Sequence, residues 1–156
     1  MAVLSNVTLS IAKIPSTPTS VRVTIKYRLT PSRVEQMARS VFNEEVSLLG
    51  RDWLTLPMEV PAAREGSLAV PTIDTPIATL GGSSFAVGES MPHVDRSRVF
   101  VISKSRLNED PETTASGSEV QDELLARVKV SYAANKPTGA SAPYPAFSAM
   151  LTGTWV

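Results

Sequence analysis

The chain contains no cysteine, and this absence excludes more chemistry than any other feature of its composition. Disulfides, zinc–thiolate sites, iron–sulfur clusters and cysteine nucleophiles all require the missing thiol. Histidine is nearly absent as well, because His93 is the only one. A single imidazole cannot build a histidine-based metal site. We therefore expect no cofactor, and no metal held by sulfur or by several histidines.

The sequence also lacks a net charge and a long apolar run. Fifteen Lys and Arg residues balance fifteen Asp and Glu residues, so no overall field draws the chain to nucleic acid, which is not an expected partner. No stretch approaches the roughly 20 apolar residues of a transmembrane helix. The first residues also lack the charged and then continuously apolar pattern of a secretory signal. We expect a cytoplasmic protein with no transmembrane segment.

Two-residue alternation of apolar and polar side chains dominates the 156 residues. Such alternation predicts half-buried β-strands. It runs through residues 3–14, 19–30, 41–50, 53–60, 97–103, 123–132 and from 146 onward, with a shorter piece at 85–87. We predict one mainly β domain over residues 1–156, an antiparallel β-sandwich of seven or eight strands with C2-like or immunoglobulin-like topology.

Two segments depart from this alternation. Residues 32–35, Ser-Arg-Val-Glu, form a capping box, and Val34, Met37 and Ala38 recur at helical spacing. One short helix is therefore predicted near residues 31–39. Between residues 61 and 82, prolines and glycines stand among small apolar residues, which predicts a long excursion over the surface.

Glu44 falls on the apolar face of the strand predicted over residues 41–50, together with Phe42, Val46 and Leu48. A carboxylate in a core is costly unless it is paired or protonated. If the strand is half-buried as predicted, Glu44 needs a partner that the sequence does not name.

The polar face of residues 19–30 carries three cations, Arg22, Lys26 and Arg28. They span roughly 20 Å along a strand, which suits a phosphate backbone. The same face offers only Thr24 and Thr30 beside them, and no aromatic side chain for stacking on bases. We therefore favour a solvated or salt-bridged face, with residues such as Glu45 and Ser47 as cross-strand partners.

Residues 108–123 are rich in Glu and Asp and supply the hard oxygen ligands that calcium prefers. A calcium-dependent C2-type module gathers aspartates on loops at one end of the sandwich. The candidates here are Asp52, Asp95, Asp110 and Asp122. An acidic, Ser/Thr-rich loop needs no ligand to be explained, however, because it also keeps a chain soluble.

A hydrolase is another alternative, because Asp95 follows His93 by two positions. A His–Asp pair serves catalysis only beside a nucleophile, and no Gly-x-Ser-x-Gly turn occurs in the chain. An ordinary loop position explains His93 equally well.

We predict a non-enzymatic structural or interaction protein that acts through protein–protein contacts, as a subunit of a homo-oligomer or a larger assembly. The segment from 146 has apolar side chains on both faces, which favours burial against a neighbour. The candidate interaction surface consists of Arg22, Lys26, Arg28, Met150, Trp155 and Val156. The alternatives are a calcium- or anionic-ligand-binding module and a hydrolase centred on His93 and Asp95. These patterns identify no family.

Overall fold

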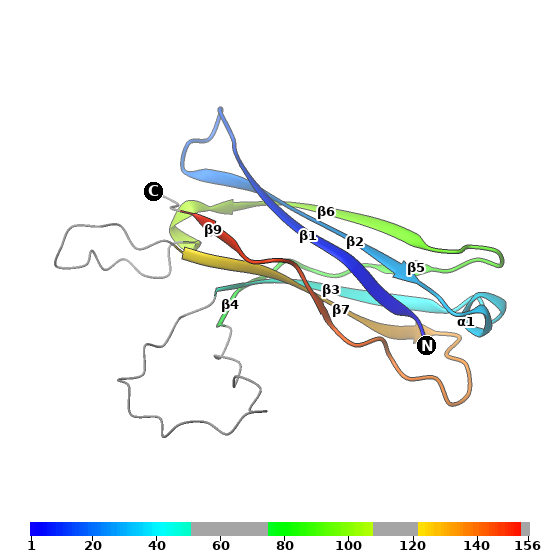
Figure 1. The fold of residues 1–156 in the computed structure, drawn as a ribbon. Helices are drawn as coiled ribbons and strands as arrows, with labels where there is room; N and C mark the ends of the chain where they lie inside the picture. Colours follow the sequence, from blue (N-terminus) through cyan, green and yellow to red (C-terminus); the bar gives the residue numbers. More distant parts are fainter. Residues whose placement is uncertain (51–74, 108–121, 154–156) are drawn as a thin grey trace, which may run out of the picture.

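Two antiparallel β-sheets packed face to face make up most of the structure, a computed structural model that describes residues 1–50, 75–107 and 122–153. One sheet has three strands and the other has six (Figure 1). The prediction of a mainly β fold with one short helix is confirmed.

The three-stranded sheet, sheet A, has the order β1-β2-β6, with β1 at Val3–Lys13, β2 at Ser20–Thr30 and β6 at Val94–Ser103. Sheet B is built on β3 (Val41–Gly50) and β7 (Asp122–Ala134). The short strands β4 (Thr75–Thr79) and β5 (Ser84–Ala86) pair with β3, and β8 (Ala146–Phe147) and β9 (Leu151–Gly153) pair with β7. A 3₁₀ turn, η1 (Lys104–Arg106), follows β6.

The core lies between the sheets and follows from the alternation in the sequence. Every second residue of β2, from Val21 to Leu29, is buried, while Arg22 and Lys26 face solvent. Opposite them lie the inward residues of β3 and β7, which include Phe42, Val46, Leu48, Leu124, Ala126, Val128 and Val130. Each large apolar side chain buried in this way contributes about 1.5–3 kcal/mol to folding.

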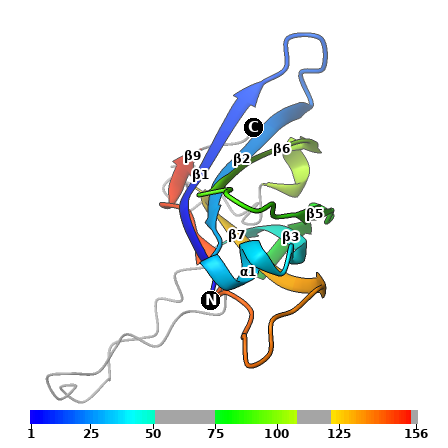
Figure 2. The ribbon, with the colours of Figure 1, turned by 90° about the vertical axis from the view of Figure 1, so that its right-hand side faces the viewer.

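The helix α1 (Arg33–Met37) forms where the capping box predicts it, with Ser32 as its N-cap. Its orientation differs from the one that the apolar spacing suggests, because Val34 and Met37 are exposed and Glu35 is buried. In a helix of five residues, the hydrogen bonds of Glu35 to Ala2 and Tyr132 decide which side turns inward. These bonds hold α1 beside the N-terminus (Figure 2). No helix in the described part of the chain has the length and apolarity to cross a membrane.

Other strand predictions meet mixed outcomes. The strand predicted at 53–60 and the first part of the excursion, up to residue 74, lie outside the described residues. Residues 75–79 form β4 instead of a loop, because Ser47–Gly50 of β3 offer them a partner. The terminal strand breaks into β8 and β9, since the Ser148 hydroxyl accepts a hydrogen bond from the Ala126 N–H at 2.9 Å.

The turn between β1 and β2 projects beyond the rest of the described chain in both ribbon views (Figures 1 and 2). Thr17 and Ser20 close it, by donating backbone hydrogen bonds to Ile14 and Thr17 at 3.0 Å each. Lys13, the last residue of β1, lies where this turn begins, at the end of sheet A farther from α1.

The first prediction concerns Gly82, which lies where the segment between β4 and β5 runs against β3. A Cβ added there would collide with the carbonyl oxygen of Glu44. We expect Gly82→Ala to lower the free energy of unfolding by about 1–3 kcal/mol, as measured by urea titration. Gly88→Ala is the control, because a Cβ at Gly88 meets no atom within 4 Å, so stability should be unchanged or slightly raised. Equal stability of the two variants would show that Gly82 is not confined.

Candidate functional site

The side chain of Glu44 is a charged group with no exposed surface. Its carboxylate lies 3.1 Å from Arg96 Nη2 and 3.2 Å from Arg98 Nε. The Ser83 hydroxyl donates to it at 2.6 Å, and the Tyr27 hydroxyl donates as well. We call Tyr27, Glu44, Ser83, Arg96 and Arg98 the Glu44 cluster.

The Glu44 cluster joins the two sheets. Glu44 points inward from β3, while Arg96 and Arg98 point inward from β6 at the edge of sheet A. The guanidinium of Arg96 also lies 4.7 Å above the ring centroid of Phe85 in β5, a cation–π geometry. Two partly exposed arginines therefore form ion pairs with one buried carboxylate.

The acid–base state of the cluster follows from these contacts. Burial by itself raises the pKa of Glu44, but the hydrogen bonds from Arg96, Ser83 and Tyr27 outweigh burial, so this pKa lies below its ordinary value. Burial and the hydrogen bond to Glu44 raise the pKa of Tyr27. Glu44 is thus an ionised acceptor and Tyr27 a neutral donor at pH 7.

Glu35 is a second buried carboxylate with a full set of donors. Its oxygens accept hydrogen bonds from the Ala2 N–H at 2.9 Å, from the Ser32 N–H at 2.7 Å and from the Tyr132 hydroxyl. Burial raises the pKa of Glu35, but the bonds from Tyr132 and Ser32 bring it below its ordinary value. Both carboxylates are therefore ionised and engaged by fixed donors, which suits structural anions and not general acids.

The two residues of the proposed hydrolase site do come together. His93 Nε2 lies 3.6 Å from Asp95 Oδ2, and both side chains are exposed. The same carboxylate is already held in a two-pronged contact by Arg28, at 2.7 and 2.9 Å. The hydrogen bond from Arg28 lowers the pKa of Asp95. Asp95 is therefore held mainly by Arg28, in an exposed ion pair on sheet A.

Of the four aspartates proposed for calcium, the two that the structure describes lie at opposite ends of the sandwich. Asp52 and Asp110 lie outside the described residues, as do residues 108–121 of the acidic loop. Asp95 pairs with Arg28 near the α1 end of sheet A, whereas Asp122 begins β7 at the opposite end of the sandwich. Among the described residues, no group of three or more His, Asp or Glu side chains is placed to hold a metal ion.

The structure corrects the predicted partners of the basic strand. Glu45 lies on sheet B, where it faces Lys129 across the strands and lies 3.5 Å from Arg127. It cannot pair with β2, because β2 is flanked by β1 and β6. The acid that does pair with the strand is Asp95, bound to Arg28.

The candidate interaction residues fall into three groups. Arg22, Lys26 and Arg28 point outward from the middle strand of sheet A. Met150 is exposed between β8 and β9, so it is not buried by the rest of the described chain. Trp155 and Val156 lie outside the described residues.

Sequence reasoning did not anticipate a shallow pocket of about 630 Å³ beside α1. Arg33, Gln36, Met37, Glu89 and Ser90 line it. The single carboxylate in this lining, Glu89, forms an exposed ion pair with Arg39 at 3.0 Å. Among the lining residues, only the exposed Met37 is an apolar side chain. It indicates a contact surface and not a catalytic site.

The Glu44 cluster generates the second prediction. Glu44→Gln leaves two inward arginines without their anion, so it should lower the free energy of unfolding by about 3–5 kcal/mol. The neighbouring change Glu45→Gln removes the same charge from a half-exposed position and should cost less than about 1 kcal/mol. Urea titrations compare them. A loss for Glu44→Gln no larger than that for Glu45→Gln would contradict the assignment.

The third prediction concerns acid. The pKa values of Glu35 and Glu44 are both lowered in the folded protein, and an unfolded Glu titrates near 4.3. Their contribution to stability is therefore fully present above the unfolded pKa and is lost as the pH falls through the folded pKa values. We expect the urea midpoint to decline below about pH 5, and to decline less steeply in Glu44→Gln. Identical pH profiles for the two proteins would rule out this role for Glu44.

No protein-family model, curated protein or solved structure matches this chain, so its function is inferred here from the arrangement of its own residues.

Proposed function

We propose that the protein is a non-enzymatic assembly subunit, and that a second copy of the chain adds to sheet A at β6. The observation that carries this proposal is a long strand edge to which no described strand adds. β6 pairs with β2 from Val94 to Ser103, and no described strand pairs with its other side. Its backbone therefore offers a row of donors and acceptors to another strand.

The side chains of β6 favour pairing. Val99 and Val101 point outward from sheet A and are 56% and 65% exposed. Free edges are usually blunted by lysine, proline or a bulge, yet the outward residue next to these valines is Ser97. Inward charges also protect edges, but here the arginines are matched by the buried Glu44.

A two-fold antiparallel pairing centred on Phe100 makes this edge complementary to itself. It places Val99 of one copy opposite Val101 of the other, so four exposed valines become two cross-strand pairs. Such β-branched pairs contribute roughly 0.2–1 kcal/mol each. The backbone hydrogen bonds of a ten-residue strand add to them, as in other cases of strand addition.

Of the two sandwich topologies, we propose the immunoglobulin-like connectivity. The strand orders β1-β2-β6 and β4-β3-β7-β8 support it. They match strands A, B and E of that fold in one layer, and strands C′, C, F and G in the other.

The fourth prediction tests the assembly. Mass photometry and light scattering of the purified full chain should show a dimer at micromolar concentration. Val99→Lys combined with Val101→Lys should weaken association at least tenfold, because it places cations opposite one another at the edge. Val3→Lys is the matched control, since Val3 is a 54% exposed valine that points outward from β1. It should leave association unchanged.

Two results would defeat the proposal in different ways. A wild-type protein that is strictly monomeric at about 100 μM would remove self-assembly. A dimer that the double substitution does not weaken would place the interface away from β6. Far-UV circular dichroism of each variant checks that the sandwich is intact.

A further inference from the structure

The zero net charge of the whole chain is not shared by the residues that the structure describes. Thirteen of the fifteen Lys and Arg residues lie in the described ranges, but only seven of the fifteen Asp and Glu residues do. Three of those seven acids, Glu35, Glu44 and Asp122, are buried. The charge balance that argues against nucleic acid in the sequence therefore does not hold for the surface that the described residues form.

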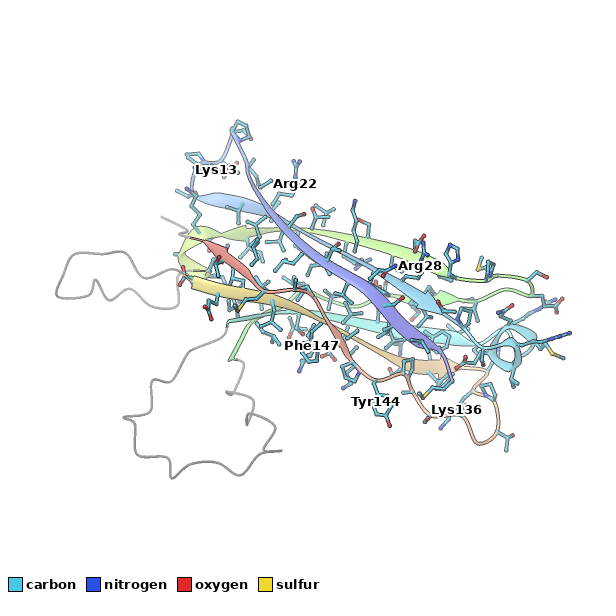
Figure 3. The ribbon with its side chains drawn as sticks, in the orientation of Figure 1. Lys13, Arg22, Arg28, Lys136, Tyr144 and Phe147 are labelled. Atoms are coloured by element: carbon cyan, nitrogen blue, oxygen red, sulfur yellow. The ribbon has the colours of Figure 1, made fainter. Side chains whose placement is uncertain are left out.

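Three of these cations lie on the outer face of sheet A, which we call the basic face: Arg22, Lys26 and Arg28 point outward from β2. Lys13, at the end of β1, pairs with the inward Val21 and so does not belong to this face. Figure 3 shows Arg22 and Arg28 along this side of the molecule. The only acid among the outward residues of these strands is Asp95, which Arg28 already holds. Arg22 and Lys26 form no ion pair with any described residue.

The rest of the basic face is rich in hydroxyl groups. The outward residues around the cations include Ser5, Thr8, Ser10, Thr24, Thr30, Ser97 and Ser103. Arginine, lysine, serine and threonine are the side chains that most often bind phosphate oxygens and sugars in nucleic acids. A face that combines these donors with almost no acid has the composition of a backbone-binding surface.

We propose that the basic face binds the phosphate backbone of duplex nucleic acid without reading its sequence. The outward residues of β1, β2 and β6 include no aromatic side chain, so the face cannot stack on the bases of a single strand. The seven residues from Arg22 to Arg28 span roughly 20 Å, which is about six base pairs of duplex at about 3.4 Å each.

An anionic membrane is the competing polyanion, and the face suits it less well. Surface-binding proteins that recognise membranes combine cations with large apolar or aromatic side chains that enter the headgroup region. The only outward apolar side chains of β6 are Val99 and Val101, at the edge of the sheet. The middle of the face carries only cations and hydroxyl groups.

The expected affinity is modest and depends steeply on salt. If Arg22 and Lys26 each neutralise one phosphate, the logarithm of the binding constant should fall with the logarithm of salt concentration at a slope of about −1.8. Affinity then drops about 12-fold between 50 and 200 mM salt. Arg28 is left out of this count because Asp95 holds it.

The fifth prediction uses fluorescence anisotropy with a labelled 20-base-pair DNA duplex and the full chain. Removal of two cations, Arg22→Ala with Lys26→Ala, should weaken binding at least tenfold at 50 mM salt and bring the slope close to zero. Arg33→Ala with Lys129→Ala is the matched control, because it removes one arginine and one lysine that are exposed elsewhere. The control should bind as the wild type does.

Each other outcome would overturn the proposal. The outcomes are no binding to the duplex at about 100 μM protein and 50 mM salt, an equal loss in both double variants, or no loss in either. Binding to vesicles with 30% phosphatidylserine without binding to the duplex would assign the face to a membrane instead. The duplex measurement depends on Arg22 and Lys26 and the assembly measurement on Val99 and Val101, so each proposal can fail alone.

Discussion

The buried ion pair of Glu44 with Arg96 and Arg98 is the constraint on which the arrangement of the two sheets depends. An ionised carboxylate in a core needs a partner, and here both partners come from the other sheet. β6 must therefore keep the register that turns Arg96 and Arg98 inward, because a slip of one residue would send them to solvent. The same register turns Val99 and Val101 outward, so a charge inside the sandwich determines what its free edge presents.

A buried ion pair is weak support for stability, because apolar residues of similar volume often serve as well. It joins β3 to β6 in one alignment, in which two cations of β6 meet one anion of β3. Glu35 acts in the same way beside α1, where one carboxylate joins Ala2, α1 and β7. Both polar contacts lie in the half of the sandwich nearer α1, and the apolar core continues from them toward the opposite end.

Sequence alternation predicts most of the strands, and it predicts correctly that Glu44 is buried, because both depend on a period of two. It cannot name the partners of Glu44, since Arg96 lies 52 residues away and meets it only once the sheet order is known. For the same reason it does not predict that Glu45 faces β7, or that Arg28 holds Asp95 in addition to the contact with His93. The apolar spacing does not predict which side of the helix turns inward, because five residues are too few for an apolar stripe to outweigh four hydrogen bonds to Glu35.

The edge and the basic face belong to the same sheet, and this couples the two proposals. If a second copy pairs with β6 around a two-fold axis, the outer faces of both copies lie on the same side of one six-stranded sheet. The two β2 strands then run antiparallel, three strand spacings or about 14 Å apart. Each spare cation gains a counterpart on the other copy, so a duplex that spans both stripes meets twice as many charges. Assembly and phosphate binding would then strengthen each other, because the edge of β6 extends the basic face instead of covering it.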